Sequence, residues 1–150
     1  MKKTPIDKRI MARMKAGVLT YSGFLGKDNR DFRQIIADDE MSLEKLGVTA
    51  EEIADRLEYF QQRSFSAFQG SAIVDDIYEV DTEVVRGYLP CPFAHQGVYR
   101  KSYTTIKNTK SGKSFTFSAL NIHLIRDHHF FEGRGSHFRL EPHELIAELF

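Results

Sequence analysis

The residues of this sequence with the clearest chemical potential lie between positions 91 and 128. The chain's one cysteine, Cys91, stands in a proline-bracketed turn, with His95 four positions further on. Two more histidines, His123 and His128, follow on a segment that predicts a helix. Thiolate sulfur and imidazole nitrogen are ligands that suit Zn²⁺, and structural sites draw four of them as two close pairs from separate elements. The spacing therefore predicts a zinc site with four ligands: Cys91, His95, His123 and His128.

A β-hairpin is predicted between these two pairs. Tyr99 to Ile106 and Ser114 to Phe117 are the two strands, and residues 108–113, Asn-Thr-Lys-Ser-Gly-Lys, are typical of the turn. Turn, hairpin and helix in this order resemble the ββα zinc finger over residues 88–129. The resemblance implies, residue by residue, the ligands Cys91, His95, His123 and His128. The sequence departs from the finger in its second ligand, a histidine instead of a cysteine, and in the longer gap from His95 to His123.

Helix geometry sets a condition on the second pair. At about 100° per residue, His123 and His128 point about 140° apart, so both reach one metal only if the helix ends or tightens near His128. Asp127 lies one turn after His123 on the same face. Asp127 is therefore predicted to be a further ligand or the carboxylate that orients an imidazole.

Catalytic interpretations of the same residues stay open. A metal with three protein ligands would activate water, and the chain would then be a metal-dependent hydrolase or nuclease acting on phosphoesters. The catalytic groups would be Asp127, His129 or Glu132 as general base and Arg126 or Arg134 as phosphate ligand. The outline also resembles the ββα-metal nucleases, although their histidine–asparagine–histidine signature does not align with His95, Asn121 and His128. Alternatively, Cys91 is a nucleophile activated by His95 or His123, or a metal-free buried side chain.

Length and composition favour one α+β domain over residues 1–150, with a subdomain boundary near Gly87 where the composition changes. A single cysteine cannot form an internal disulfide, which fits a reducing compartment. The start of the chain is charged where a signal peptide needs an apolar core, and no stretch approaches the roughly 18 apolar residues of a membrane span. We therefore expect a cytoplasmic protein with no membrane partner.

Charge is strongly segregated although the formal net charge is zero. Residues 1–30 carry eight basic and two acidic side chains (+6), residues 31–85 four and fourteen (−10), residues 86–139 nine and two (+7), and residues 140–150 three acids (−3). One interpretation is that acidic and basic parts face each other in the fold or in a homo-oligomer, which would then be a metal-free scaffold. The other is a basic surface for an unknown protein or nucleic-acid partner on the 100–113 hairpin, formed by Arg100, Lys101, Lys107, Lys110 and Lys113.

The remaining elements follow from periodicity and capping signals. A helical first half and a C-terminal half with a small antiparallel sheet and two helices are expected. Helices are predicted over Pro5 to Ala16, Asp31 to Glu40, Ser42 to Leu46, Thr49 to about Gly70, Ser118 to His128, and from Pro142 onward. Residues 73–85 predict one or two strands. Residues 18–26 fit a short strand or a buried loop, of which the loop is favoured, and residues 133–136 predict a loop.

Overall fold

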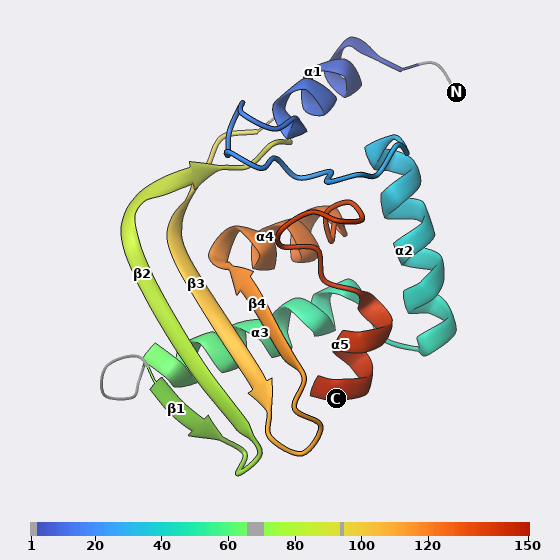
Figure 1. The fold of residues 1–150 in the computed structure, drawn as a ribbon. Helices are drawn as coiled ribbons and strands as arrows, with labels where there is room; N and C mark the ends of the chain where they lie inside the picture. Colours follow the sequence, from blue (N-terminus) through green and yellow to red (C-terminus); the bar gives the residue numbers. More distant parts are fainter. Residues whose placement is uncertain (1–2, 66–70, 94) are drawn as a thin grey trace.

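The computed structural model describes residues 3–65, 71–93 and 95–150, and these form a mixed α+β arrangement (Figure 1). The predicted fold class is confirmed. The helices are α1 (Pro5–Met14), α2 (Phe32–Leu46), α3 (Ala50–Phe65), α4 (Ala119–His128) and α5 (Pro142–Leu149). The strands are β1 (Ser71–Val74), β2 (Tyr78–Pro90), β3 (Val98–Asn108) and β4 (Ser114–Ser118).

The sheet is antiparallel, with the strand order β1-β2-β3-β4. Its centre is a long ribbon in which β2 pairs with β3 from Tyr78 and Asn108 at one end to Pro90 and Val98 at the other. Among the described residues, β1 pairs with residues 78–81 of β2, and β4 pairs with residues 103–107 of β3. The end of the ribbon near Pro90 is therefore two-stranded. A register shift between Val84 and Tyr88 interrupts β2, and such bulges bend a strand. The bent ribbon carries the β2–β3 connection toward α1 and α4 (Figure 1).

Two apolar cores meet at α4. The larger core lies between the sheet, α3 and α5 and includes Leu57, Phe60 and Phe117, while the smaller one joins α1, α2 and the loop after α1 to the β2–β3 connection. α4 supplies Ile122 and Ile125 to the larger core and Leu120 and Leu124 to the smaller one. Because α4 is buried on both sides, its position is fixed by the packing of the whole chain.

Helix starts follow the capping signals of the sequence. Thr4 and Asp7 form a capping box at α1, and Ser118 and Asn121 form another at α4. At α3 the Thr49 hydroxyl accepts a bond from the backbone N–H of Glu52 (3.1 Å). α3 reaches at least Phe65, and its predicted end near Gly70 lies outside the described residues. No helix in the described ranges is both long and apolar enough to cross a membrane.

The prediction of two separate helices between residues 31 and 46 is wrong. α2 is continuous from Phe32 to Leu46, and the acidic run of residues 38–40, which would be unfavourable at a helix C-terminus, lies inside it with its charges neutralised by tertiary ion pairs. Asp39 binds the guanidinium of Arg139 through both oxygens (2.6 and 2.9 Å), and Asp38 accepts a bond from Arg30 (2.7 Å). Helix propensity along residues 31–46 takes no account of an ion pair with a residue 100 positions later in the sequence.

Acidic and basic segments face each other within the fold, as one interpretation of the charge pattern predicted. Arg126 of α4 pairs with Asp55 (2.9 Å) and Glu58 (3.0 Å) of α3. His129 lies between Glu40 and Glu51, with a distance of 2.8 Å to each. Much of the segregated charge is therefore used to join the acidic first half to the basic second half.

Candidate metal centre

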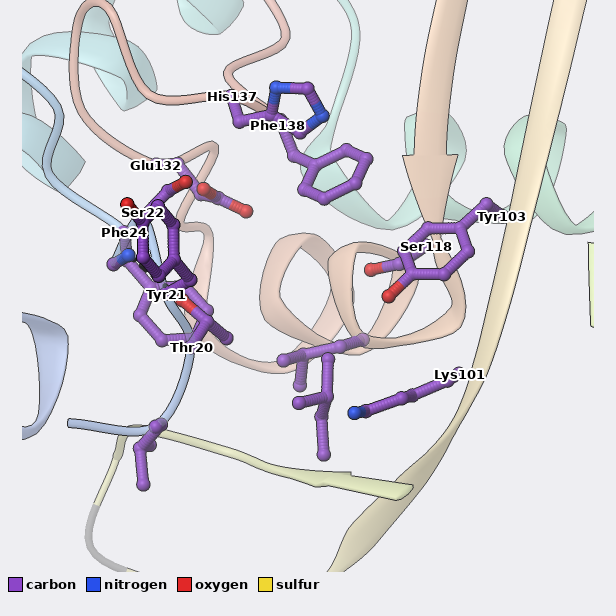
Figure 2. A pocket seen from close by; sticks show the side chains of 14 residues that line it. Thr20, Tyr21, Ser22, Phe24, Lys101, Tyr103, Ser118, Glu132, His137 and Phe138 are labelled. Atoms are coloured by element: carbon purple, nitrogen blue, oxygen red, sulfur yellow. Dashed lines mark hydrogen bonds between the residues drawn. The ribbon is translucent and has the colours of Figure 1, made fainter. Parts of the chain in front are cut away.

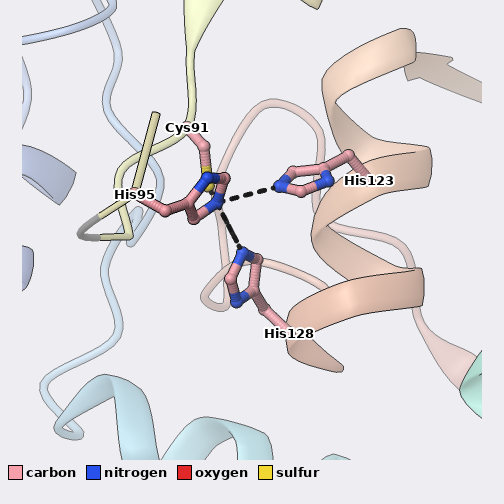
Figure 3. A group of neighbouring side chains, drawn as sticks. All are labelled: Cys91, His95, His123 and His128. Carbon is pink, nitrogen blue, oxygen red and sulfur yellow. Dashed lines mark hydrogen bonds between the residues drawn. The ribbon is translucent and has the colours of Figure 1, made fainter. Parts of the chain in front are cut away.

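Four potential metal ligands converge where the β2–β3 connection meets α4. Cys91 and His95 come from that connection and His123 and His128 from α4, and Figure 3 shows the three imidazoles and the sulfur turned toward a common point. One ligand atom from each residue lies within 4.8 Å of those of the other three. We call these four residues the Cys–His cluster. Its members are the four residues singled out by the sequence, and they could hold a metal ion.

The connection that carries Cys91 is held by the first helix. Arg13 of α1 donates from Nη2 to the carbonyl of Cys91 (2.5 Å) and from Nε to the carbonyl of Pro92 (3.0 Å). Phe93 is buried in the smaller core, and its ring stacks on the His128 imidazole with a centroid distance of 4.0 Å and an interplanar angle of 4°. The backbone at Cys91 and Pro92 and the His128 ring are thus held in place by contacts within the protein itself.

The helix end meets the condition that the spacing imposed. His128 is the last residue of α4, and His129 has a left-handed conformation with φ 54°. The backbone N–H of Phe130 then donates to the carbonyl of Leu124 (3.0 Å). The helix therefore ends directly after His128, as the spacing required, and the His123 and His128 side chains reach the same point.

Three distances within the cluster are close to those between the ligands of a tetrahedral zinc site, and all four ligand atoms lie within 4.8 Å of one another. Nε2 of His95 lies 3.0 Å from Nε2 of His128 and 3.2 Å from Nε2 of His123, and Sγ of Cys91 lies 3.5 Å from Nε2 of His128. Zinc bonds of about 2.0–2.1 Å to nitrogen and about 2.3 Å to sulfur place neighbouring nitrogens about 3.3 Å apart and nitrogen and sulfur about 3.6 Å apart. The donor types and their spacing therefore fit a tetrahedral metal.

Hydrogen bonds on the outer nitrogens fix the tautomers of two imidazoles. Nδ1 of His95 lies 2.7 Å from the carbonyl of Gln96, and since a carbonyl only accepts, this nitrogen carries the proton. Nδ1 of His123 lies 2.9 Å from a carboxylate oxygen of Asp127 and 3.0 Å from the hydroxyl of Tyr99. Each ring, when neutral, therefore presents an unprotonated Nε2 to the cluster centre, with the outer support typical of metal-binding histidines.

Burial controls the protonation of the other groups. Desolvation, followed by the neighbouring histidines, lowers the pKa of His128 to about 4, and burial also lowers the pKa of His123. Both imidazoles are therefore neutral, and able to bind a cation, at neutral pH. Burial raises the pKa of the Cys91 thiol to about 11, against the lowering effects of the Phe93 N–H and the Arg13 charge. A bound dication would reverse this by stabilising the thiolate.

No family model, no curated protein and no solved structure matches this chain. The functional inference therefore depends on the chemistry of its own side chains.

The residues proposed for catalysis are mostly engaged elsewhere. Asp127 contacts the cluster through His123, in the orienting role that its helical position predicted. His129 and Arg126 are held in their ion pairs with α2 and α3. Glu132 is buried among Asn121 and Ser136, and Arg134 is exposed with its backbone N–H bound to Asp28. Of these five, Asp127 alone has a contact with a cluster residue among the described interactions.

Three contributors to the site were not identified from the sequence: Arg13, Phe93 and Tyr99. Arg13 acts across 78 residues, and no local pattern could have connected it with Cys91. Phe93 and Tyr99 flank the turn, and their aromatic character beside a Cys–His pair was the available signal. All three position the ligands rather than supply ligand atoms.

Proposed function

We propose that the Cys–His cluster binds one structural Zn²⁺ and that the protein acts by binding a partner rather than by catalysis. The observation that carries the zinc proposal is the pair of unprotonated Nε2 atoms of His95 and His123, which face each other at 3.2 Å. Two nitrogen lone pairs at this distance repel each other unless a proton or a cation lies between them. A metal ion relieves this repulsion and uses the thiolate of Cys91 as well.

Zinc is favoured over other metals by the donor set. Three imidazoles and one thiolate are borderline-to-soft ligands with no carboxylate among the four, which suits Zn²⁺ and not Mg²⁺ or Ca²⁺. Four side chains complete a tetrahedral shell and leave no position for water or substrate. A shell closed in this way argues for a structural role. The order of the elements, first the β2–β3 connection, then the β3–β4 hairpin and then α4, supports the proposed likeness to a ββα zinc finger.

A zinc ion at this position would stabilise a part of the fold that has little other support. The end of the β2–β3 ribbon near Pro90 is two-stranded, and isolated two-stranded ribbons are marginally stable in water. A zinc ion would join the connection at residues 91 and 95 to α4 at residues 123 and 128. Metal binding would thus contribute directly to the stability of the second half of the chain.

The proposed partner surface lies on the β3–β4 hairpin. Lys107, Lys110 and Lys113 are exposed and form no ion pair in the described part of the chain, unlike the arginines that join the two halves. Arg100, on the same strand, is likewise exposed and unpaired within those limits. Unpaired cations on one hairpin favour an acidic protein surface or a nucleic acid as the partner.

Elemental analysis of protein purified without chelator tests the zinc proposal. One zinc per chain is expected in the parent, and loss of the metal in Cys91→Ser and in His123→Ala. His143→Ala is the matched control, because His143 is exposed on α5 and outside the cluster. Metal-free parent protein that also fails to take up Zn²⁺ on titration would refute the proposal.

The runner-up function, metal-dependent hydrolysis of phosphoesters, predicts a different coordination. It requires water in one metal position and a free base beside it. X-ray absorption of the zinc-loaded protein separates the two, since a structural site gives one sulfur and three nitrogens and a hydrolytic site gives an added oxygen. The engagement of His129, Glu132 and Arg126 elsewhere is the reason that the structural role is preferred.

A further inference from the structure

A cavity of about 290 Å³ lies beside the smaller core, apart from the Cys–His cluster. It is bounded by the loop after α1, by β3, by the start of α4 and by the loop of residues 132–138 (Figure 2). None of the four cluster residues lines it. Its size is near the lower limit of small-ligand pockets, about 300 Å³, so it suits a ligand with a single ring.

The wall of this cavity is mainly apolar and partly aromatic. Phe24 and Leu120 line it from the smaller core. Phe138 also lines it, and its ring stacks on the Tyr103 ring at a centroid distance of 5.5 Å. Tyr21 stands on the loop after α1 and is 96% exposed, so its ring is available to cover a bound group. Side chains of this kind bind an aromatic group by removing it from water and by ring–ring contact.

One cation in the wall has no partner. Lys101 of β3 is half-buried and forms no ion pair within the described residues. Its aliphatic stem runs beside Gly87, at the register shift in β2, where an added Cβ would lie 3.5 Å from Cδ of Lys101. Figure 2 shows the Lys101 amine directed into the space in front of α4. The stem is therefore packed against β2, while the ammonium is left to bind an anion.

The carboxyl group in the wall, that of Glu132, is already bound within the protein. It is 2% exposed, and its oxygens accept hydrogen bonds from the Asn121 amide and the Ser136 hydroxyl, each at 2.6 Å. Burial raises the pKa of Glu132 to about 7, against the lowering effects of these bonds and of the Arg139 charge. At about pH 6 Glu132 is therefore mostly protonated, and Lys101 supplies the charge that a ligand meets.

We propose that this cavity binds an aromatic monocarboxylate. The carboxylate of the ligand pairs with the Lys101 ammonium, and its ring lies among Phe24, Leu120 and Phe138. The single charge of this ligand matches the single unpaired cation, and its apolar body matches the rest of the wall. A phosphate ester would bring about two negative charges and leave one of them unpaired. The assignment is independent of the zinc proposal, because no residue of the Cys–His cluster takes part.

Titration of the full chain, followed by NMR, tests the proposal with defined probes. Phenylacetate, 3-phenylpropanoate and 4-phenylbutanoate place the ring at increasing distances from the carboxylate. Each is compared with the alcohol and the amine of the same chain length, as neutral and cationic controls. At about pH 6, at least one carboxylate is expected to bind about tenfold or more tighter than both of its controls. It should shift the backbone amide signals of Phe24, Lys101 and Phe138 more than those of the Cys–His cluster.

Two results would overturn the proposal on the parent protein alone. One is that none of the three carboxylates binds at millimolar concentration. The other is that the alcohols bind as tightly as the carboxylates, because the Lys101 ammonium would then contribute nothing.

Two variants separate the charge from the ring contact. Lys101→Met keeps the stem, and it should lower the carboxylate affinity about tenfold, to that of the alcohol. Lys107→Met is the matched control, because Lys107 is an exposed lysine of the same strand outside the cavity. Phe138→Ala should weaken the carboxylate and the alcohol alike and leave their ratio unchanged. Circular dichroism verifies folding, and unchanged carboxylate affinity in folded Lys101→Met would contradict the assignment.

Discussion

The high pKa of the Cys91 thiol leads to a strong pH dependence of zinc binding. Zinc binds the thiolate, but burial holds the pKa of the free thiol at about 11, so the metal must displace one proton throughout the neutral range. The lowered pKa values of His123 and His128 keep these imidazoles neutral over the same range. The apparent affinity should then rise about tenfold per pH unit between about pH 7 and pH 9, which is about 100-fold or about 2.7 kcal/mol in all.

Competition against a chromophoric chelator of known pH dependence measures this slope. Cys91→Ser is the comparison: it should lose zinc on purification, and the weaker affinity that titration with excess Zn²⁺ measures should lack the slope attributable to the thiol, because a hydroxyl does not ionise in this range. Co²⁺ can replace Zn²⁺ as a spectroscopic probe, and sulfur-to-cobalt charge-transfer absorption should be present in the parent and absent in the variant. A parent affinity that is flat between about pH 7 and pH 9 would refute the thiolate-ligand reasoning.

Three further perturbations test other parts of the structure. Asp127→Asn should weaken metal affinity by about 10–100-fold, measured by chelator competition, because His123 loses the carboxylate that accepts its Nδ1 proton; unchanged affinity would mean that the carboxylate has no orienting role. Asp39→Ala should destabilise the fold by about 2–4 kcal/mol in denaturant unfolding, since it removes the buried carboxylate from the Arg139 guanidinium and leaves only the more exposed Glu141 as its ion-pair partner; a loss below about 1 kcal/mol would contradict this. The folded-state pKa of Glu132 is raised from 4.5 to about 7, so its contribution to stability is complete below about pH 4.5 and is lost as the pH rises through about 7. Glu132→Gln should remove up to about 3 kcal/mol of that decline, seen by comparing unfolding free energies of parent and variant across this window, and identical pH profiles would disprove it.

The ligand set could be predicted because its information is local. Cys91 and His95 share a turn, and His123 and His128 share a helix, so each pair is visible as a spacing of four or five residues. The requirement that the helix end at His128 was also a local argument, from 100° per residue, and the structure meets it through the left-handed His129. Capping residues and the hairpin turn were predictable for the same reason.

The parts that the sequence did not reveal depend on distant partners. The continuity of α2 requires the ion pair between Asp39 and Arg139, and the placement of the Cys91 backbone requires Arg13. Glu132 was one of the three general-base candidates that the sequence placed near the metal. The chain turns at residue 129 and carries Glu132 to the wall of a different cavity, which proximity in sequence could not show.

Arg13 donates hydrogen bonds to the carbonyls of Cys91 and Pro92, so α1 supports a site whose residues lie about eighty positions later in the sequence. A fusion partner or deletion that displaces α1 would release the two peptide groups that precede the first histidine of the cluster. Recombinant versions that lack α1 would then lose the metal although all four ligands are present. Recombinant protein in which α1 is complete and free to dock is consequently expected to keep its zinc.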